Sequence, residues 1–444
     1  MKRTRKLSRR NFLAAAGAVA GAPYLLPSCT LARHGRPGAN DRLTVAVAGV
    51  GGMGGGHLRD FLRRRKRGEV NVAAVCDVDE NRLAEAVRIS GPGVEPYRDY
   101  RYILERDDID AVVIATPDHW HAVQTVHACE SGKHVYVEKP TSVTINDGET
   151  MIAATKKYNR VVQVGSQARS AEPAHQACTY IRNGMLGKVH KVTCWHKLNP
   201  TGGTDPDREP PAELDWDLWL GPLHWRPYNS AYCHGVFRWV MESGGGVIRD
   251  RGAHVMSVIR WCLDADEQMP VTIEAKGYPP NKGIWDCPPA MEVVYTFKDP
   301  DWQLIWAQPG DRQSNYPDKN DDFGMVFHGE DDTLVLDRDG TRYDAPEKAR
   351  NFKVPAGGVE VYRMDKYADY NMNHKEDWLQ AIRTGATPCM DIEKGHRTAT
   401  MCNLGNLSYL LGRTLRWDAK KQEVVDDPYA NRLLSKPQRH PYHL

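Results

Sequence analysis

The fold is decided by the stretch RLTVAVAGVGGMGGGHLRDFLRRRKRG, residues 42–68. Its first part is a short apolar run rich in valine, which is typical of a buried strand. The run passes into Gly49-x-Gly51-x-x-Gly54, and the residues that follow predict a helix ending at Gly68. Glycines allow the backbone to turn tightly and to approach a pyrophosphate, and free N–H groups at the helix start can bind it. The stretch therefore predicts a dinucleotide-binding turn.

A second strand, VNVAAVCDVD at 70–79, carries Asp77 near its end. A carboxylate there can accept hydrogen bonds from a ribose diol and would repel a 2′-phosphate, so NAD is favoured over NADP. Arg82 lies close enough in the sequence to keep NADP open. The competing interpretation is a plain glycine-rich turn with a capping aspartate. The cofactor-binding residues expected in this region are Gly49, Gly51, Gly52, Met53, Gly54 and Asp77.

Strand-like and helix-like segments then alternate: a strand at 110–117, a helix from His119 to Ser131, and strands at 133–140 and 160–167. This alternation predicts an α/β Rossmann domain, a doubly wound parallel sheet, over residues 41–167. Ligands bind at the carboxyl ends of such strands. The polar or turn residues expected at these ends, where a nicotinamide ring would lie, are Thr116, Pro117, His121, Glu138, Lys139 and Gln167.

After residue 168 the pattern changes to strand-like segments with few helices between them. They lie at 187–199, 271–277, 291–299, 302–308 and 323–338. We expect an α+β domain over residues 168–372 with a mostly antiparallel open sheet. Residues 373–444 should add C-terminal helices and a tail packed on the body. The Pro-, Gly- and Trp-rich stretch 199–235 is typical of a long functional loop.

The most informative segment of the second half is SGGGVIRDRGAHVMSVIRWCL, residues 243–263. On a single helix, Asp250, His254, Ser257 and Trp261 would fall within about 60° of one another. A carboxylate four residues before a histidine can contact it, orient the ring and raise its basicity. The alternative is that Asp250 caps the helix start and His254 is a satisfied buried histidine.

Composition excludes several classes of protein. The chain has 59 Lys and Arg against 57 Asp and Glu, but six of the basic residues lie in the first ten positions, which leaves 53 against 57. A nucleic-acid binder would show a basic excess on its folded domain, so we expect no nucleic-acid partner. The ten cysteines show no C-x-x-C and no paired Cys/His spacing, so neither a metal site nor a dense disulfide framework is indicated.

The first 40 residues have the pattern of a leader. Two adjacent arginines in SRRNFL precede the apolar run FLAAAGAVAGA, and SRRNFL resembles a twin-arginine signal. The run is shorter than the roughly 20 residues that span a bilayer, so no transmembrane helix is expected. We predict export to the periplasm, with cleavage after residues 18–20 or with lipid attached at Cys29 in LPSC. An uncleaved amphipathic helix is the alternative.

The chain resembles the Gfo/Idh/MocA oxidoreductases over nearly everything after residue 41. The matching pieces are the Gly49–Gly54 turn, ATPDHWHAVQTVHACESGKHVYVEKP at 115–140 and GGGVIRDRGAH at 244–254. Together with the leader and residues 373–418, they look most like the exported twin-arginine branch of the family. Many members carry an aspartate three residues after the histidine of this last motif, where the present chain has Ser257.

The resemblance implies NAD or NADP on the Rossmann half and a sugar or polyol on the sheet of the other half. It also implies that Lys139 lies beside the nicotinamide and that His254, partnered by Asp250, transfers the proton. On this basis the catalytic residues are Lys139, Asp250 and His254. Further substrate-pocket candidates are Gln167, Arg169 and Tyr228, with His121 near the cofactor.

Three functions compete at this point. The first is an NAD-dependent oxidoreductase acting on a hydroxyl of a sugar or sugar derivative. The second is redox-neutral glycoside cleavage by oxidation, elimination and reduction, which an exported protein with a retained cofactor would favour. The third is a non-catalytic NAD-binding sensor, because a fold does not guarantee chemistry. An exposed sheet face in the second domain also predicts a homodimer or homotetramer.

Overall fold

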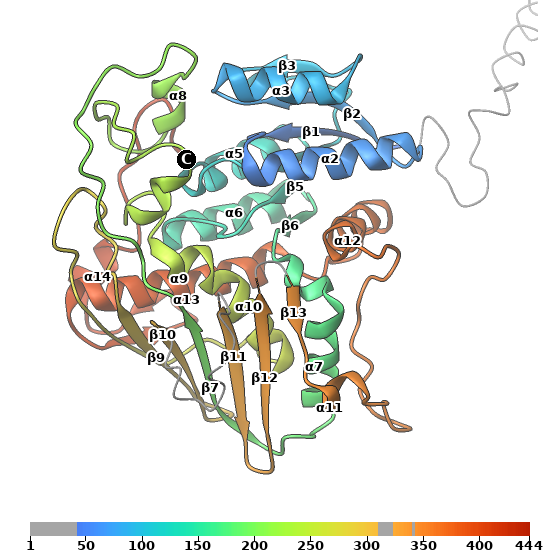
Figure 1. Cartoon of the computed structure of the whole chain (residues 1–444), viewed down its shortest axis with the longest axis vertical. Helices are drawn as coiled ribbons and strands as arrows, with labels where there is room; N and C mark the ends of the chain where they lie inside the picture. The colour runs from blue at the N-terminus through green and yellow to red at the C-terminus, as the bar shows by residue number, and fades with distance from the viewer. Residues whose placement is uncertain (1–41, 310–322, 340–341) are drawn as a thin grey trace, which may run out of the picture.

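The computed structural model describes residues 42–309, 323–339 and 342–444 of the chain (Figure 1). The predicted leader, with its twin arginines and Cys29, lies outside the described residues. In the part of the chain that is described, no helix combines the length and apolar character needed to cross a membrane.

The N-terminal half is built on a six-stranded sheet in the order β3-β2-β1-β4-β5-β6, with every pair parallel. Its central strands are buried because their residues are almost all apolar on both faces. This strand order is that of a doubly wound Rossmann sheet, so the prediction for this half is confirmed. The strands are β1 (Thr44–Ala48), β2 (Asn71–Cys76), β3 (Glu95–Tyr97), β4 (Ala111–Ile114), β5 (His134–Val137) and β6 (Val162–Val164).

Helices connect these strands and cover both faces of the sheet (Figure 1). Side-chain caps fix several starts: Asp79 accepts from Arg82 N at the start of α3, and Thr144 accepts from Asp147 N at the start of α6. The helices are α2 (Gly52–Lys66), α3 (Glu80–Ser90), α4 (Arg101–Leu104), η3 (Asp118–Trp120), α5 (His121–Glu130) and α6 (Ile145–Lys157).

The second half is built on a nine-stranded sheet in the order β13-β12-β11-β7-β10-β9-β8-β14-β15. Its pairs are antiparallel except β10 with β7, so a mostly antiparallel sheet is confirmed. The strands are β7 (Val189–His196), β8 (Thr272–Gly277), β9 (Met291–Phe297), β10 (Trp302–Gln308), β11 (Phe323–Gly329), β12 (Thr333–Asp339), β13 (Arg342–Asp344), β14 (Leu415–Asp418) and β15 (Glu423–Val424).

Helices α9, α10 and α13 lie between this sheet and the Rossmann half (Figure 1), and their apolar residues form one core with the strands. α12 instead packs on the Rossmann half, where Trp378 and Leu379 join the core of β1 and α2. The helices are η4 (Gln167–Ser170), α7 (Glu172–Arg182), α8 (Trp216–Leu220), η5 (Gly235–Trp239), α9 (Gly246–Asp250), α10 (Gly252–Cys262), α11 (Glu347–Arg350), α12 (Tyr370–Thr384), α13 (Ile392–Leu411) and α14 (Pro428–Arg432).

Candidate active site

The glycine turn between β1 and α2 is shaped to admit a phosphate. Gly49 has φ +79°, and a Cβ there would lie 2.7 Å from the carbonyl carbon of Ala115. A Cβ on Gly54 would collide with the carbonyl oxygen of Gly49. The first turn of α2 carries no acidic residue and Gly51 offers no capping side chain, so backbone N–H groups remain for an anion. These residues fit the pyrophosphate of a dinucleotide.

Asp77 follows β2 and stabilises the same turn. One carboxylate oxygen accepts from Val50 N at 2.9 Å and the other from Asp79 N at 3.1 Å. Burial raises the pKa of the Asp77 carboxyl, and these two backbone donors oppose that rise. Asp77 also lines the neighbouring cavity together with Arg82, so both a carboxylate and a guanidinium lie where a ribose would bind.

A cavity of about 250 Å³ opens beside the turn, with Thr116 and Pro117 in its wall. Residues of the second half cover it, among them Trp219, His234 and Phe237 of α8, η5 and the segment between them. Several contacts attach this segment, residues 213–238 (the covering segment), to the residues that follow β2. Asp215 N donates to Val78 O at 3.0 Å, and His234 Nε2 lies 3.0 Å from Asp79 Oδ2. The stretch 199–235 thus contributes a wall of the nucleotide cavity.

Glu138 follows β5 and lies in a buried polar cluster. Its Oε1 lies 2.8 Å from His57 Nε2 and accepts from Gln167 Nε2 at 2.7 Å. Burial alone would raise the pKa of Glu138, but the His57 hydrogen bond, the Lys139 charge and the Gln167 hydrogen bond lower it to about 2. The carboxylate is therefore ionised, and it links α2 and η4 to the residue that precedes Lys139.

Lys139 contacts Asp250 directly. Its Nζ donates to Asp250 Oδ1 at 2.6 Å and to the carbonyl oxygen of the same residue at 2.9 Å. The carboxylate also lies 3.2 Å from Arg238 Nε and 3.4 Å from Arg251 Nε. Burial would raise the pKa of Asp250, but these three cations hold it well below its usual range. The ionised carboxylate of Asp250 therefore forms ion pairs with three cations.

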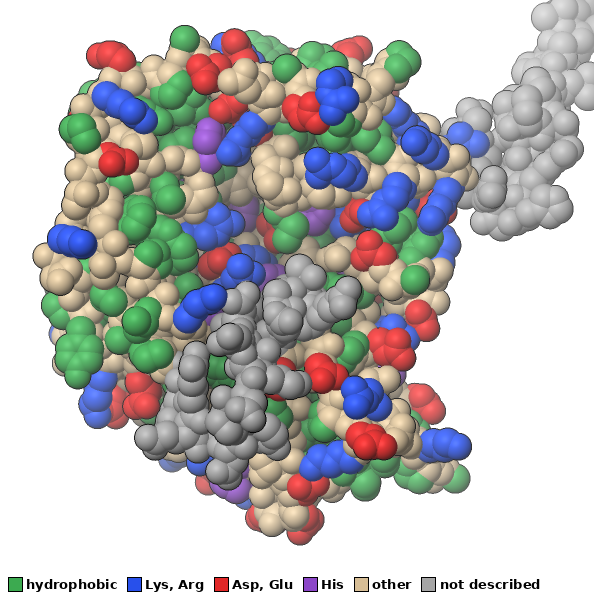
Figure 2. All heavy atoms as spheres, in the orientation of Figure 1, with side chains coloured by type: hydrophobic (Ala, Val, Ile, Leu, Met, Phe, Trp, Pro, Cys, Tyr) green, Lys and Arg blue, Asp and Glu red, His purple; other side chains and the backbone are tan. Residues whose placement is uncertain are grey.

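His254 lines a second, larger cavity, which has a volume of about 890 Å³. Lys139, Gln167 and Asp250 also lie in the wall of this larger cavity. Figure 2 shows basic, acidic and histidine side chains gathered in the hollow between the two halves. Met53 and Arg238 line both this cavity and the nucleotide cavity, so the two adjoin there. The nicotinamide end of a dinucleotide in the turn would reach this junction.

The segment predicted as one helix is broken at Arg251, between α9 and α10. Because of this break, Asp250 and His254 are not successive residues on one helix face. Among the described residues, the ion pairs of Asp250 are with Lys139, Arg238 and Arg251. The structure therefore pairs Asp250 with the lysine, where the sequence suggested the histidine. Asp250 and His254 still line one cavity.

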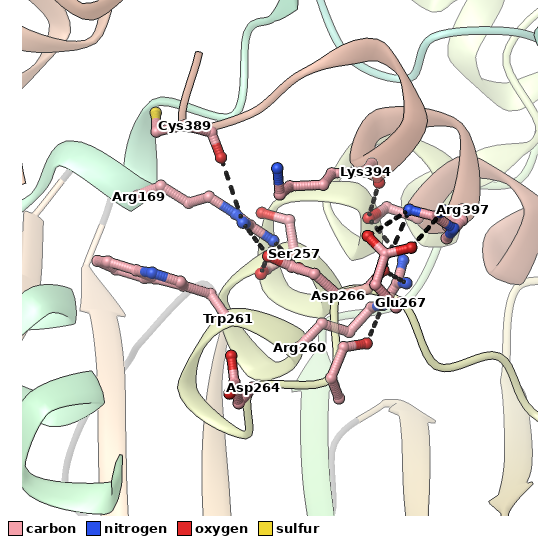
Figure 3. Close-up of polar contacts among 12 residues, drawn as sticks. Arg169, Ser257, Arg260, Trp261, Asp264, Asp266, Glu267, Cys389, Lys394 and Arg397 are labelled. Carbon is pink, nitrogen blue, oxygen red and sulfur yellow. Dashed lines mark hydrogen bonds and ion pairs between the residues drawn. The ribbon is translucent and has the colours of Figure 1, made fainter. Parts of the chain in front are cut away.

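Arg169 was expected in the substrate pocket, but its guanidinium points elsewhere (Figure 3). It donates to both carboxylate oxygens of Asp266, at 2.5 and 2.7 Å, and to Ser257 O at 2.8 Å. Arg169 is buried in this cluster, which joins η4 to the end of α10. A bidentate ion pair thus engages the planar guanidinium, and Arg169 is not among the residues that line the larger cavity, so its contact with substrate stays a prediction.

Tyr228 and His121 are likewise held by the fold. Tyr228 packs edge-on against Trp216 at 5.1 Å in a small apolar core of the covering segment. His121 bridges two chain segments, with Nδ1 2.7 Å from Pro140 O and Nε2 2.9 Å from Thr116 O. Both side chains are buried. Tyr228 is not among the residues that line the two cavities, so its contact with substrate stays a prediction. His121 instead positions the strand ends that flank the nicotinamide site.

Sequence reasoning missed three residues of the site: His57, Arg238 and Arg251. The two arginines had a partial signal, because Arg251 flanks Asp250 in IRDRGAH and Arg238 follows an aromatic run. No sequence pattern pointed to His57, which lies within α2. Within the described residues, no group of three or more His, Cys, Asp or Glu side chains is arranged to hold a metal ion.

Comparison with known families decides the classification. The profile "Oxidoreductase family, NAD-binding Rossmann fold" matches residues 43–166, and "Oxidoreductase family, C-terminal alpha/beta domain" matches residues 174–334 and 343–444. The chain belongs to the Gfo/Idh/MocA oxidoreductase family. The glycine turn and Lys139 lie in the first match of this family member, and Asp250 and His254 lie in the second.

Three similar proteins illustrate the range of the family. Inositol 2-dehydrogenase of Salmonella paratyphi B is 30% identical over 186 residues, which cover 41% of the chain and 54% of that protein. A glycosyl hydrolase family 109 protein of Shewanella pealeana is 28% identical over 206 residues, 41% of the chain and 44% of that protein. The aldose-aldose oxidoreductase structure from Caulobacter crescentus has a TM-score of 0.58 at 19% identity and covers 84% of the chain and 99% of its own. At this level of identity, the similarity between the two chains shows a common fold.

Proposed function

We propose that the protein is an NAD-dependent oxidoreductase that transfers a hydride between a hydroxyl-bearing carbon of a sugar, or sugar derivative, and nicotinamide. The observation that carries the proposal is the Lys139–Asp250 ion pair, 2.6 Å long, in one cavity with His254. This cavity adjoins the glycine turn through Met53 and Arg238. The name of the Salmonella inositol dehydrogenase is consistent with a polyol substrate.

Oxidation of a secondary alcohol removes a hydride from carbon and a proton from oxygen. Bound NAD supplies the hydride acceptor. Lys139, as the cationic partner of ionised Asp250, donates a hydrogen bond to the substrate oxygen and stabilises the charge that develops there. His254 accepts the hydroxyl proton, so that the C–O single bond becomes a carbonyl. The hydride and proton together account for the two electrons and two hydrogens lost by the sugar.

NAD is proposed over NADP because Asp77 lies at the end of β2 in the nucleotide cavity, where its charge disfavours a 2′-phosphate. Arg82 lines the same cavity and would favour the phosphate, so the assay must separate the two cofactors. The purified protein is denatured, and the supernatant is tested with dehydrogenases specific for NAD and for NADP. Recovery of NADP alone would overturn the choice.

The catalytic role of Lys139 is tested by Lys139→Met, with Lys156→Met on the exposed face of α6 as the matched control. Absorbance at 340 nm is followed with a panel of sugars, polyols and glycosides. We expect Lys139→Met to lose at least about 100-fold in turnover, as removal of a charge-stabilising donor does, while keeping its NAD content. Near-normal turnover would remove Lys139 from the mechanism. A non-catalytic sensor would instead hold NAD and turn over no sugar in either form.

A second candidate function is redox-neutral glycoside cleavage with a retained cofactor. The covering segment favours it, because Asp215 and His234 attach residues of the second half over the nucleotide cavity. The similarity to a glycosyl hydrolase family 109 protein is consistent with it. Release of aglycone from a glycoside without net NADH would select this function, and stoichiometric NADH would select dehydrogenation.

Export and assembly stay predictions. The leader supports transport of the folded protein to the periplasm, with the cofactor already bound, and a lipid at Cys29 is the variant of that prediction. The alternating burial along β8 and β9 leaves one face of the second sheet partly exposed, which supports a homodimer or homotetramer. Sizing by light scattering and N-terminal analysis of protein from the periplasm test these two points.

A further inference from the structure

Among the described residues that line the larger cavity, cations outnumber acids. The lysines and arginines among its described residues are seven, against three aspartates. The cations are Arg59, Arg63, Lys139, Lys197, Arg238, Arg251 and Lys375, and the acids are Asp60, Asp250 and Asp369. A neutral sugar needs no such excess, because its hydroxyls are recognised by donors and acceptors alike.

Two of the three acids are engaged on the α2 and α12 side of the cavity. Asp60 lies 2.7 Å from Lys375 Nζ and also pairs with Arg63. Asp369 lies 3.6 Å from Arg63. These pairs balance one another, so they do not offset the charge around Lys139.

Asp250 is the remaining acid among the described residues of the cavity wall, and three cations share it. Lys139 donates to its Oδ1 at 2.6 Å, while the two arginines lie farther away, with Nε at 3.2 and 3.4 Å from the carboxylate. Glu138 and Asp118 also act electrostatically on Arg238, but neither lines the cavity. Within the described residues, the ion pair of Arg251 is with Asp250 alone.

Arg251 lines the cavity, its closest nitrogen to Asp250 is Nε, and its side chain is 39% exposed. A guanidinium with free Nη groups is matched to a carboxylate, phosphate or sulfate through two parallel hydrogen bonds. Arg238 lines the nucleotide cavity as well and can serve the cofactor. Of these two cavities, Arg251 lines only the larger one, so a change at Arg251 tests substrate binding separately from cofactor binding.

We propose that the substrate is a sugar with an anionic substituent, and that Arg251 binds the anion while Lys139 and His254 act on a neighbouring hydroxyl. The inference rests on the proposed function and names its substrate class. Among the described residues, Arg251 has one ion pair, through Nε with Asp250 at 3.4 Å, and an anion could occupy the Nη groups of the same guanidinium. An oxidised nicotinamide ring, itself positive, also attracts an anion.

The test is calorimetric titration of the NAD-loaded protein with matched sugars. Methyl β-D-glucuronide is compared with methyl β-D-glucoside, and glucose 6-phosphate and glucose 6-sulfate are compared with glucose. We expect at least one anionic member to bind about tenfold or more tighter than its neutral partner, as a charge-assisted hydrogen-bond pair provides. The member that does so identifies the anion as carboxylate, phosphate or sulfate.

Arg251→Gln should reduce this preference to near unity, and Arg251→Lys should keep part of it; the affinities for the charged and the neutral sugar are compared within each variant, so that an effect common to both sugars cancels. Arg88→Gln, on the exposed face of α3, is the matched control. If Arg251→Gln does not fold, the wild-type salt dependence serves: the anionic sugar should lose affinity between low and high salt, and the neutral sugar should not. Equal binding of charged and neutral sugars would overturn the proposal. Hydride transfer from neutral sugars in that case would leave the proposed function standing, and absence of hydride transfer from every sugar would remove that function instead.

Discussion

Replacement of Glu138 by glutamine isolates the buried carboxylate that precedes Lys139. The side chain is 5% exposed, and its pKa is about 2 in the folded protein against an ordinary value of 4.5. Since one pKa unit corresponds to about 1.36 kcal/mol, the fold favours the ionised form by roughly 3 kcal/mol at neutral pH. Glu138→Gln keeps the shape and one acceptor oxygen but removes the charge. It should lower the free energy of unfolding at pH 7 by up to about 3 kcal/mol.

The pH dependence of this loss has a definite sign. Because the folded-state pKa lies below the unfolded value, the stabilisation is complete above about pH 5 and is lost as the pH falls from 4.5 towards 2. The difference in stability between wild type and Glu138→Gln should therefore narrow by about 1 kcal/mol between pH 7 and pH 4. Stability of the variant should depend less steeply on pH over this interval.

Urea unfolding followed by tryptophan fluorescence at pH 7, 5 and 4 measures the difference directly. Glu85→Gln is the matched control, since Glu85 is exposed on α3 and pairs only with Arg88 among the described residues. We expect no measurable loss of stability for this control. A variant as stable as wild type at pH 7, or a difference that stays constant to pH 4, would refute the reasoning about Glu138.

Two further predictions concern the turn and the buried arginine. Gly49→Ala should lower the NAD content of the purified protein at least about tenfold, because φ of +79° costs an L-residue roughly 1–2 kcal/mol and the new Cβ would lie 2.7 Å from Ala115. Gly56→Ala is the control, since Gly56 has open space around it and the variant should retain the cofactor. Normal NAD content in both variants would contradict the role of the glycine turn in binding the cofactor. Arg169→Met should cost about 3–5 kcal/mol of stability without changing KM, because it leaves Asp266 unpaired and does not face the cavity. A raised KM at normal stability would return Arg169 to the substrate pocket.

The Rossmann half was readable from the sequence because its signals are local. The valine-rich β1 and the three glycines lie in one short stretch. A Cβ on Gly49 would meet the backbone of Ala115, which follows β4, and a Cβ on Gly54 would meet the backbone of Gly49. Lys139 and Gln167 could be placed in the site for a related reason. In a parallel sheet the residues after each strand share one edge, so alternation alone brings these side chains together.

The substrate half was harder to predict because loop polarity does not say where a side chain points. Arg169 and Tyr228 looked suited to a sugar, yet one is held by Asp266 and the other by Trp216. Arg251 looked incidental, yet the break between α9 and α10 places it in the cavity wall. A helical projection through residues 243–263 could not detect that break.

The sequence by itself determined the class of the fold and the nucleotide turn, because strand periodicity and glycine spacing act over a few residues. The family resemblance of its motifs implied the catalytic candidates Lys139, Asp250 and His254. Only the tertiary structure decided which groups meet. Asp250 contacts Lys139, 111 positions away in the chain, and Arg238 in addition to its neighbour Arg251. Such contacts depend on how the two halves of the chain pack against each other, and a local sequence pattern does not specify the partner of a buried charged residue.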